Sequence, residues 1–214
     1  MKNNWLRGYT VIYLIFLYAP ILLLPLFAFN ASTIIAFPLQ GFTTEWFKEL
    51  LTIDALHGAV RNSLFIAVVS AVLATSLGVC AAMASARYEF KAKRGLIGLI
   101  MLPLVLPEII VAVALLVVLI RLGVNLSSWT VILGHTLICT PFCIAVLNAS
   151  FQNLDPAYEE AALDLGCSPA EAFRLVTLPI IAPAVISGWL LAFTLSLDDL
   201  VIASFTSGPA ATTL

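Results

Sequence analysis

Long apolar stretches alternate with short polar ones along the whole chain. Five of them carry at most one Asp, Glu, Lys or Arg: Tyr9–Phe29, Asn62–Ala86, Gly95–Ile120, Leu122–Leu154 and Leu175–Leu197. A helix needs about 20 apolar residues to cross a bilayer, so each stretch is long enough for one span. A helix that is apolar on every side is typical of a membrane span. The pattern therefore predicts an all-α, polytopic transmembrane helical bundle.

The boundaries of two spans need adjustment. The fourth stretch is too long for one span, so its first residues are predicted to form a loop that contains Trp129. The fifth span is predicted to begin near Pro183 and to continue past Asp199 to about residue 205. We expect one transmembrane domain over residues 1–214, with spans at about 9–29, 62–86, 95–120, 130–151 and 183–205.

The first stretch follows Lys2 and Arg7, an arrangement that also occurs in secretory signal peptides. The apolar core of a signal peptide is about 7–15 residues long and is followed by an A-x-A cleavage site. Here the stretch covers 21 residues, and no such site follows it. We therefore expect an uncleaved first span.

Composition supports a membrane protein. Hydrophobic residues make up 62% of the chain and charged residues 10%, with a mean hydropathy of +1.08. A soluble domain has about 25% charged residues, so this chain cannot cover a water-facing surface. The low content of charged residues excludes a soluble globular enzyme and a disordered tail. It also excludes a nucleic-acid binder, because such a protein needs a basic face. The net charge of −2 says little about partners.

Lys and Arg side chains predict the orientation, because cytoplasmic loops are enriched in them. With the N-terminus inside, seven lie in cytoplasmic segments and three in outer segments; the seven are Lys2, Arg7, Arg87, Lys91, Lys93, Arg94 and Arg174. The outer three are Lys48, Arg61 and Arg121. We expect a multi-pass inner-membrane protein with a cytoplasmic N-terminus, an external segment at 30–60 and a cytoplasmic loop at about 152–182.

The cysteines do not indicate a metal or redox site. Cys80, Cys139, Cys143 and Cys167 form no C-x-x-C pair, and three of them lie inside apolar runs. We interpret them as small buried hydrophobic residues. No metal and no cofactor are predicted.

The cytoplasmic loop contains signals for two short helices. Asp155 and Pro156 are suited to start the first, and Gly166 to end it in a left-handed conformation. Ser168 and Glu171 have the spacing of a capping box, which starts the second. This helical hairpin is predicted to dock a cytoplasmic protein. An amphipathic hairpin on lipid headgroups is the alternative, but the loop has five acids and one Arg, which anionic lipid would repel.

The loop also resembles a known family. Glu160-Ala161-Ala162, three residues, Gly166, nine residues and Val176-Thr-Leu178-Pro179 match the EAA loop of ABC-importer permeases, with Val in place of Ile at 176. The resemblance implies the type I permease fold and a coupling helix that sits in a groove of a separate ATPase subunit. It implies that Glu160, Ala161, Ala162 and Gly166 make this contact, and that Leu178 and Pro179 complete the motif.

The chain contains no G-x-x-x-x-G-K-[ST] segment, which is the loop that binds ATP phosphates. We therefore predict a transport subunit without its own ATPase site, driven by a partner.

Carboxylates inside predicted spans are the candidate chemistry, because buried ionisable residues in membranes are rare and usually functional. Glu108 lies about 20 Å from Gly95, and Asp198 about 22 Å from Pro183, along helices that rise about 1.5 Å per residue. Asp199 follows directly. No Lys or Arg lies within any predicted span. We expect a polar path at this depth for a cationic substrate.

Each candidate has an alternative. Glu108 follows two prolines, so it is also suited to satisfy N–H groups at a kink. Adjacent residues lie about 100° apart on a helix, so Asp198 and Asp199 are not both expected to face the path. One would line it and the other would cap a broken helix or meet a neighbouring subunit. Ser196 can add a hydroxyl to the path, whereas His135 and Trp189 are interpreted as packing residues.

The external segment contains a short amphipathic stretch with Trp46 and Phe47. These aromatic side chains are interpreted as an interfacial belt. A contact between Trp46 and a cation is the alternative.

A second resemblance narrows the substrate. The stretch from Ser187 to Phe205, followed by Ser207-Gly-Pro, resembles the fifth span of spermidine/putrescine permeases, closest to the second permease of the pair. The resemblance implies import of polyamines with a sister permease, an ATP-binding subunit dimer and an extracytoplasmic polyamine-binding protein. It assigns Trp46, Glu108, Ser196, Asp198 and Asp199 to the substrate path. Permeases of this subgroup have six spans, so we expect either a fragment or a shortened product.

The predicted function is alternating access driven by a separate ATPase. Three alternatives remain: an ion-coupled secondary transporter of an organic cation, an inactive truncated assembly subunit, and an intramembrane hydrolase. The hydrolase is disfavoured because the two histidines, His57 and His135, occur in neither an H-E-x-x-H nor a G-x-S-x-G context.

Overall fold

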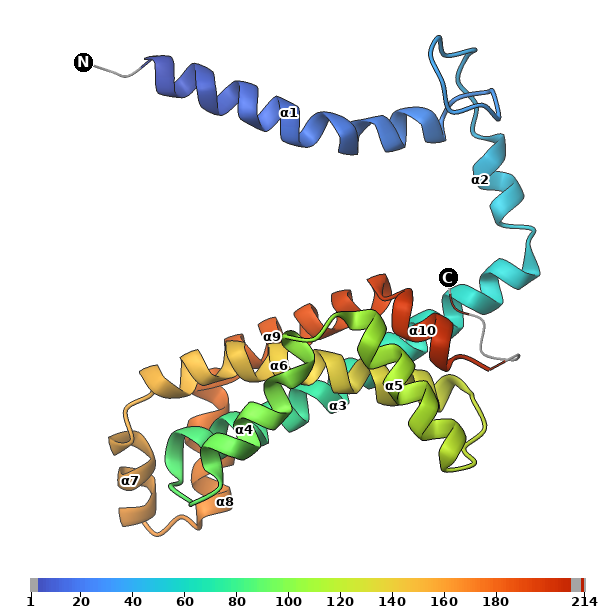
Figure 1. The fold of residues 1–214 in the computed structure, drawn as a ribbon. Coiled ribbons are helices and arrows are strands. Elements are labelled where there is room, and N and C mark those ends of the chain that lie inside the picture. Colours follow the sequence, from blue (N-terminus) through green and yellow to red (C-terminus); the bar gives the residue numbers. More distant parts are fainter. Residues whose placement is uncertain (1–3, 209–212, 214) are drawn as a thin grey trace. The chain divides into compact units, whose positions relative to one another are not determined.

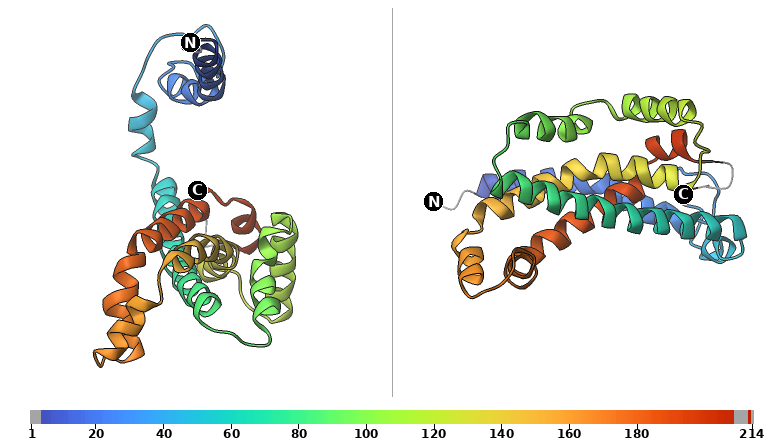
Figure 2. Two further views of the ribbon diagram at one scale, coloured as in Figure 1. Left: turned by 90° about the vertical axis from the view of Figure 1, so that its left-hand side faces the viewer. Right: turned by 90° about the horizontal axis from the view of Figure 1, so that it is seen from below.

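The computed structural model describes residues 4–208 and 213, and these residues are organised as two compact units, Met1–His57 and Gly58–Leu214 (Figures 1 and 2). Each unit is described by itself. In the described residues the regular elements are helical, with one isolated bridge between Asn30 and Phe42.

The first unit contains two helices. Helix α1, Asn4–Ala28, includes the predicted first span to within one residue and has Arg7 in its first turn. None of its most apolar window is buried by the chain itself, as expected for a surface that meets lipid. Helix α2, Glu45–Leu50, follows a loop at 29–44.

Asn30 organises this loop. Its side chain accepts a hydrogen bond from the backbone N–H of Gln40 and donates one to the carbonyl of Ile34. Its backbone pairs with Phe42, and only 1% of Asn30 is exposed. A buried polar side chain must find such partners to avoid a desolvation penalty, so the loop folds around this residue.

Three long helices form the centre of the second unit (Figure 1). They are α3, Asp54–Arg87, α6, Ser128–Asn153, and α9, Leu178–Asp198. Helices α3 and α6 contain the predicted spans 62–86 and 130–151. Helix α9 begins earlier than the predicted fifth span and ends earlier; a separate short helix, α10, covers Val201–Thr206.

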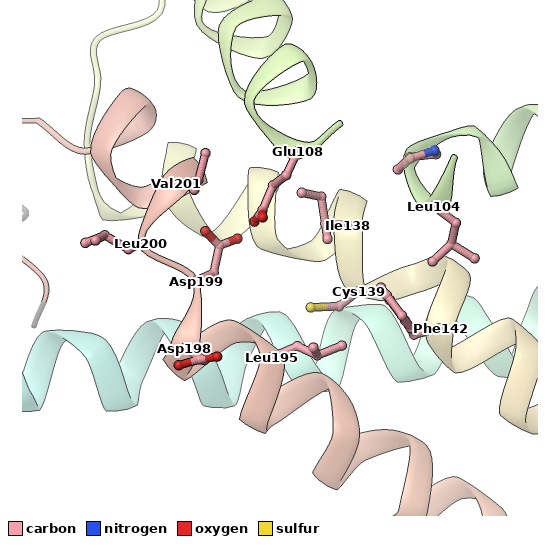
Figure 3. A pocket seen from close by; sticks show the side chains of 11 residues that line it. Leu104, Glu108, Ile138, Cys139, Phe142, Leu195, Asp198, Asp199, Leu200 and Val201 are labelled. Carbon is pink, nitrogen blue, oxygen red and sulfur yellow. The ribbon is translucent and has the colours of Figure 1, made fainter. Parts of the chain in front are cut away.

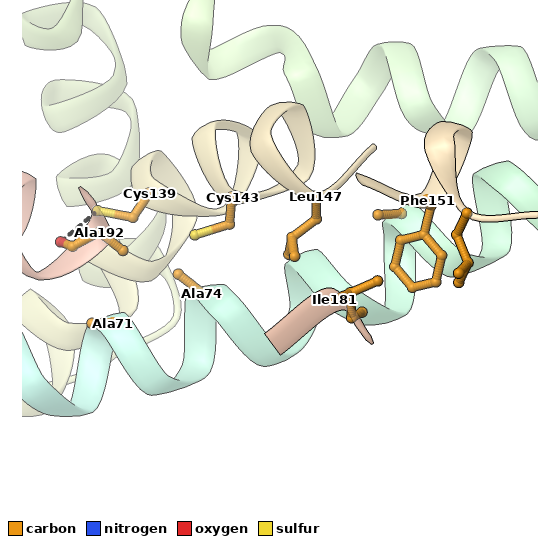
Figure 4. Packing of buried hydrophobic residues seen from close by; sticks show 10 residues of the cluster. Ala71, Ala74, Cys139, Cys143, Leu147, Phe151, Ile181 and Ala192 are labelled. Carbon is orange, nitrogen blue, oxygen red and sulfur yellow. Dashed lines mark hydrogen bonds between the residues drawn. The ribbon is translucent and has the colours of Figure 1, made fainter. Parts of the chain in front are cut away.

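Small residues on α3 allow these helices to pack closely. Ala71, Ala74 and Ala82 are buried against a cluster from α6 and α9 that includes Cys139, Cys143, Leu147, Phe151, Ile181 and Ala192 (Figure 4). Gly78 lies in the same row; a Cβ atom there would be 2.7 Å from Cβ of Cys143. In lipid, close backbone approach of this kind is a main source of helix association.

The prediction of buried cysteines is right for Cys139 and Cys143. Cys80 is exposed within the chain, however, and Cys167 is only partly buried. All four are free thiols.

The predicted third span is not one helix. Helix α4, Lys93–Met101, continues as the 3₁₀ turn η1, Leu102–Leu104, and helix α5, Glu108–Arg121, then leaves at an angle of 107° to it. The cause is local to Pro107, which lacks an N–H donor and is itself extended, with ψ of 131°; helical backbone continues through Leu102 and Pro103. The predicted span at about 95–120 is therefore not a continuous helix, and whether the bent pair crosses the membrane as one span stays a prediction.

Four helices are long and apolar enough to cross a membrane, and the bent pair α4–α5 makes a fifth if it counts as one span. This count refers to the described part of the chain. The five-span arrangement itself stays a prediction.

The loop between α6 and α9 is helical. It consists of α7, Ala157–Asp164, then α8, Pro169–Ala172, and the π-helical segment η2, Phe173–Thr177, which continues directly into α9. The first of the two predicted short helices is therefore present. The second is not separate, because nothing breaks the backbone between Ser168 and the span that follows.

Candidate substrate site and coupling loop

A cavity of about 320 Å³ lies where η1, α6 and the start of α5 meet the link between α9 and α10 (Figure 3). Three carboxylates line it: Glu108, Asp198 and Asp199. The other lining residues are uncharged: Pro103, Leu104, Ile138, Cys139, Phe142, Leu195, Leu200 and Val201. The cavity thus combines concentrated negative charge with an apolar wall.

Glu108 reaches the cavity because of the break in the third span. Pro107 is extended, with ψ of 131°, and Glu108 is the first residue of α5. The free N–H groups at a helix start favour a negative side chain there, which agrees with the kink interpretation of this residue. Its carboxylate nevertheless points across the cavity toward Asp199 (Figure 3), so Glu108 belongs to the site as well.

Asp198 and Asp199 both line the cavity, which corrects the expectation that only one would. That expectation assumed a continuous helix through both residues. Helix α9 instead ends at Asp198, and Asp199 is extended, with φ of −75° and ψ of 103°. Asp199 also has the capping role predicted for one of the pair, because its Oδ1 accepts a hydrogen bond of 2.8 Å from the N–H of Ile202 in α10.

His135, which was interpreted from the sequence as a packing residue, lies directly behind this cavity, beside Asp199. It is 2% exposed, and its Nδ1 lies 2.6 Å from Oγ of Ser196. Its Nε2 has no hydrogen-bond partner and lies 3.7 Å from Oδ2 of Asp199. His135 therefore connects Ser196, which is buried, to the carboxylates. No sequence signal pairs these residues, because they come from α6 and from the end of α9.

Trp46 is described in the other unit, on α2. It is partly buried, and its indole Nε1 donates a 2.8 Å hydrogen bond to the carbonyl of Asn30. Phe47 packs against Phe29, with ring centroids 5.1 Å apart. In this unit Trp46 therefore holds the loop at 29–44 together.

The predicted coupling residues lie on α7 and the turn after it. Glu160 and Ala161 are exposed, whereas Ala162 is 6% exposed and packs against the chain itself. The three residues thus divide between an outward and an inward face of one short helix. A partner on the outward face would meet Glu160 and Ala161 but not Ala162.

Gly166 ends α7 as predicted. Its φ is +90°, a left-handed value that residues with a Cβ rarely adopt. The N–H of Gly166 donates to the carbonyl of Leu163, and the N–H of Cys167 to that of Ala162. This is a Schellman motif, in which the glycine satisfies the last helical carbonyls.

The other predicted caps of the loop are present too. Oδ1 of Asp155 accepts a hydrogen bond from the N–H of Ala157, at the start of α7. Ser168 and Glu171 form the reciprocal capping box. Leu178 and Pro179 form the first turn of α9, so the EAA-like motif runs from the exposed hairpin into the long helix.

Comparison with known proteins identifies the family. Residues 74–213 match the model of the family described as binding-protein-dependent transport system inner membrane component. The chain belongs to this family.

Relatives in bacteria are similar over the whole chain. The putrescine transport system permease protein PotI of Escherichia coli K12 is 42% identical, over 100% of this chain and 78% of the relative. The spermidine/putrescine transport system permease protein PotC of the same strain is 40% identical, over 98% and 80%. A molybdenum transport system permease protein, ModB of Mycobacterium bovis, is 33% identical over 77% of this chain and 69% of the relative.

Solved structures show the same fold. A bacterial ABC transporter involved in the import of the acidic polysaccharide alginate matches with a TM-score of 0.76 at 15% identity, over 99% of this chain and 78% of that one. The same kind of transporter in complex with an alginate-bound periplasmic protein matches with a TM-score of 0.71, at 18% identity. The all-helical, type I permease fold is confirmed, and such likeness leaves the substrate open.

These findings confirm a multi-pass membrane permease of an ABC importer, which is a transport component. They also support a substrate-binding protein as its partner.

Proposed function

We propose that this permease imports polyamines through the cavity between α5, α6 and the α9–α10 link. The observation that carries the proposal is the lining of this cavity, which has three carboxylates and, among the lining residues, no Lys or Arg. Like charges close together repel each other unless a cation compensates them. A substrate with two or more ammonium groups supplies this compensation.

The apolar part of the lining fits the rest of a polyamine. Leucine and valine side chains and the ring of Phe142 surround the carboxylates, and they suit the methylene groups between two amines. The volume is near the lower end of the range of about 300–1,000 Å³ for small-molecule sites. The relatives named for putrescine and spermidine transport support the same substrate class.

In this proposal the N-terminus is cytoplasmic, and the α6–α9 loop meets an ATP-binding subunit dimer. Glu160, Ala161 and the Gly166 turn make the contact, with Leu178 and Pro179 leading into α9. A sister permease completes the path. ATP binding moves α7, the two permeases rock about the cavity, and the polyamine-binding protein reloads it from outside. Trp46 is proposed to act at the outer mouth of the path.

The substrate claim is tested by uptake of radiolabelled putrescine into proteoliposomes that contain the assembled importer. Glu108→Gln and Asp198→Asn are expected to lower uptake at limiting substrate, since each variant removes one of the negative charges that an ammonium group would meet. Glu89→Gln, a carboxylate exposed outside the cavity, is the matched control. Unchanged uptake in both cavity variants would refute the proposal.

The energy source and docking claims need separate measurements. Uptake should require ATP and persist when a protonophore collapses the proton gradient, whereas an ion-coupled carrier would show the opposite. The ATP-binding subunit should co-purify with the permease, and Glu160→Ala should weaken this association while Glu89→Ala should not. Equal co-purification of both variants would exclude Glu160 from the docking surface.

A further inference from the structure

Arg87 links three elements on the side of the second unit where α7 lies. It is the last residue of α3. Its Nε donates to Oε2 of Glu159 on α7 at 3.1 Å, and its Nη2 donates to Oε1 of the same carboxylate at 3.3 Å. The same Nη2 donates to the carbonyl of Leu154, the C-cap of α6, at 3.2 Å. One guanidinium group therefore holds the ends of α3 and α6 to α7.

Thr177 extends this arrangement to α9. Its Oγ1 donates a 2.8 Å hydrogen bond to Oε1 of Glu159, and its side chain is fully buried. Thr177 is the last residue of the π-helical segment that runs into α9. The carboxylate of Glu159 is thus shared between α3 and α9. We call these three residues the Arg87–Glu159–Thr177 cluster.

The cluster differs from an ordinary surface ion pair. The side chains of Arg87 and Glu159 are 14% and 18% exposed, and they are 72 positions apart in sequence. Arg–carboxylate pairs with two parallel hydrogen bonds are strong and directional. The pair Lys93–Glu89, in contrast, joins neighbours on one turn, and Glu89 is 89% exposed. Such exposed pairs contribute little.

Glu159 lies on the inward side of α7, next to the residues that are exposed for a partner. The next two residues, Glu160 and Ala161, are exposed and free for a partner, whereas Glu159 and Ala162 face the chain. Helix α7 has eight residues and ends in a glycine turn, and its inward side also contacts α8 and η2. A force on its outer face must pass through these inward contacts.

The π-helical segment η2 is a point at which movement of α7 can change the start of α9. Single π turns inside α-helices are common at functional sites, because their wider hydrogen-bond pattern can shift register. Here the segment Phe173–Thr177 separates α8 from α9, and its last residue is held by Glu159.

We propose that Arg87, Glu159 and Thr177 are positioning residues that transmit movement of α7 to α3 and α9, so that ATP hydrolysis and substrate passage stay coupled. The proposal deepens the proposed function and rests on it. Neither Arg87 nor Glu159 acts on substrate or nucleotide. Glu159 acts by fixing α7 to both spans, and Thr177 by keeping the start of α9 in that contact.

The test measures putrescine imported per ATP hydrolysed, in proteoliposomes of the assembled importer. Glu159→Ala and Arg87→Ala are expected to lower this ratio by about 2- to 30-fold, the range for mutations along a coupled connection. Arg87→Lys keeps the charge but not the paired hydrogen bonds, so it should recover only part of the ratio. Because the three residues act together, Arg87→Ala combined with Glu159→Ala should be no worse than the more damaging single variant.

Controls separate coupling from folding. Lys93→Ala and Glu89→Ala remove the exposed pair nearby and should leave the ratio unchanged. A merely structural role would lower the amount of assembled importer but not the ratio measured per assembled complex. If the alanine variants do not assemble, Thr177→Val decides, since it removes one hydrogen bond and retains nearly the same volume; its ratio should also fall.

The proposal would be overturned if assembled Glu159→Ala and Arg87→Ala importers moved as much putrescine per ATP as the unsubstituted importer. Where these variants do not assemble, the same result in Thr177→Val would overturn it. Either outcome would leave polyamine import intact. Failure of the parental importer to take up putrescine would instead refute the proposed function.

Discussion

Gly166→Ala tests the coupling loop through backbone conformation alone. Gly166 has a φ of +90°, and a Cβ atom built there meets no neighbouring atom within 4 Å. The substitution therefore introduces no clash, and its effect comes from the left-handed backbone, which costs about 1–2 kcal/mol for a residue with a Cβ. If α7 docks only with this turn in place, the docking-competent fraction should fall by about 5- to 30-fold, since about 1.4 kcal/mol is tenfold.

The assay is the affinity of the purified permease pair for its ATP-binding subunit, measured by titration in detergent. Gly166→Ala should raise the apparent Kd by that factor, and Gly166→Asn, which tolerates the left-handed region better, should raise it less. Gly188→Ala is the control, because it also adds a methyl group into open space but at an ordinary helical position of α9. Equal affinities for Gly166→Ala and Gly188→Ala would refute the reasoning.

Three further predictions concern packing and caps. Gly78→Ala places a Cβ 2.7 Å from Cβ of Cys143. This overpacking should lower the free energy of unfolding in detergent by about 1–3 kcal/mol, whereas Gly188→Ala should not lower it. Ser168→Ala removes the cap of α8 and should destabilise the loop by about 1 kcal/mol, with Ser168→Asp restoring it; hydrogen exchange of the loop amides measures both. Asp199→Ala should be about 1 kcal/mol less stable than Asp199→Asn, as thermal melts would show, because both variants remove the charge but only Asn can still accept the hydrogen bond that caps α10.

The features that could be predicted from the sequence are those with local causes. Apolar length alone predicts the long helices, because a span needs no partner to be recognised. The caps of the α6–α9 loop follow from residues only a few positions apart: Asp155 with the start of α7, Gly166 with its end, and Ser168 with Glu171. Each of these interactions is complete within a few residues, so the sequence contains all the information needed.

The cavity could be predicted only in part. Its carboxylates were found because charge is rare in spans, but the depth calculation treated the third span as one straight helix. Glu108 reaches the cavity that Asp199 lines because the chain turns through 107° between Leu104 and Glu108. His135 was missed, since nothing near it in sequence indicates that Ser196 and Asp199 lie beside it.

The Arg87–Glu159–Thr177 cluster illustrates the same limit. Arg87 was used only to assign orientation, and Glu159 was counted among the acids of the loop. Their contact joins residues 72 positions apart and depends on how α3, α6 and α7 converge. A single sequence gives the charge of each residue but not the partner that it finds.

Two of the carboxylates that line the cavity, Glu108 and Asp199, lie at points where helices are interrupted. This coincidence argues for a function. Glu108 stands where α5 begins after the proline break, and Asp199 stands in the extended link between α9 and α10. Irregular backbone at membrane depth is tolerated only where protein buries it or where it lines a water-filled cavity. Two breaks from distant parts of the chain that open onto one cavity, each bearing a carboxylate, are hard to explain by packing alone, because an unbroken apolar helix would pack more simply. A path that binds and releases a cation needs such open backbone and charge together.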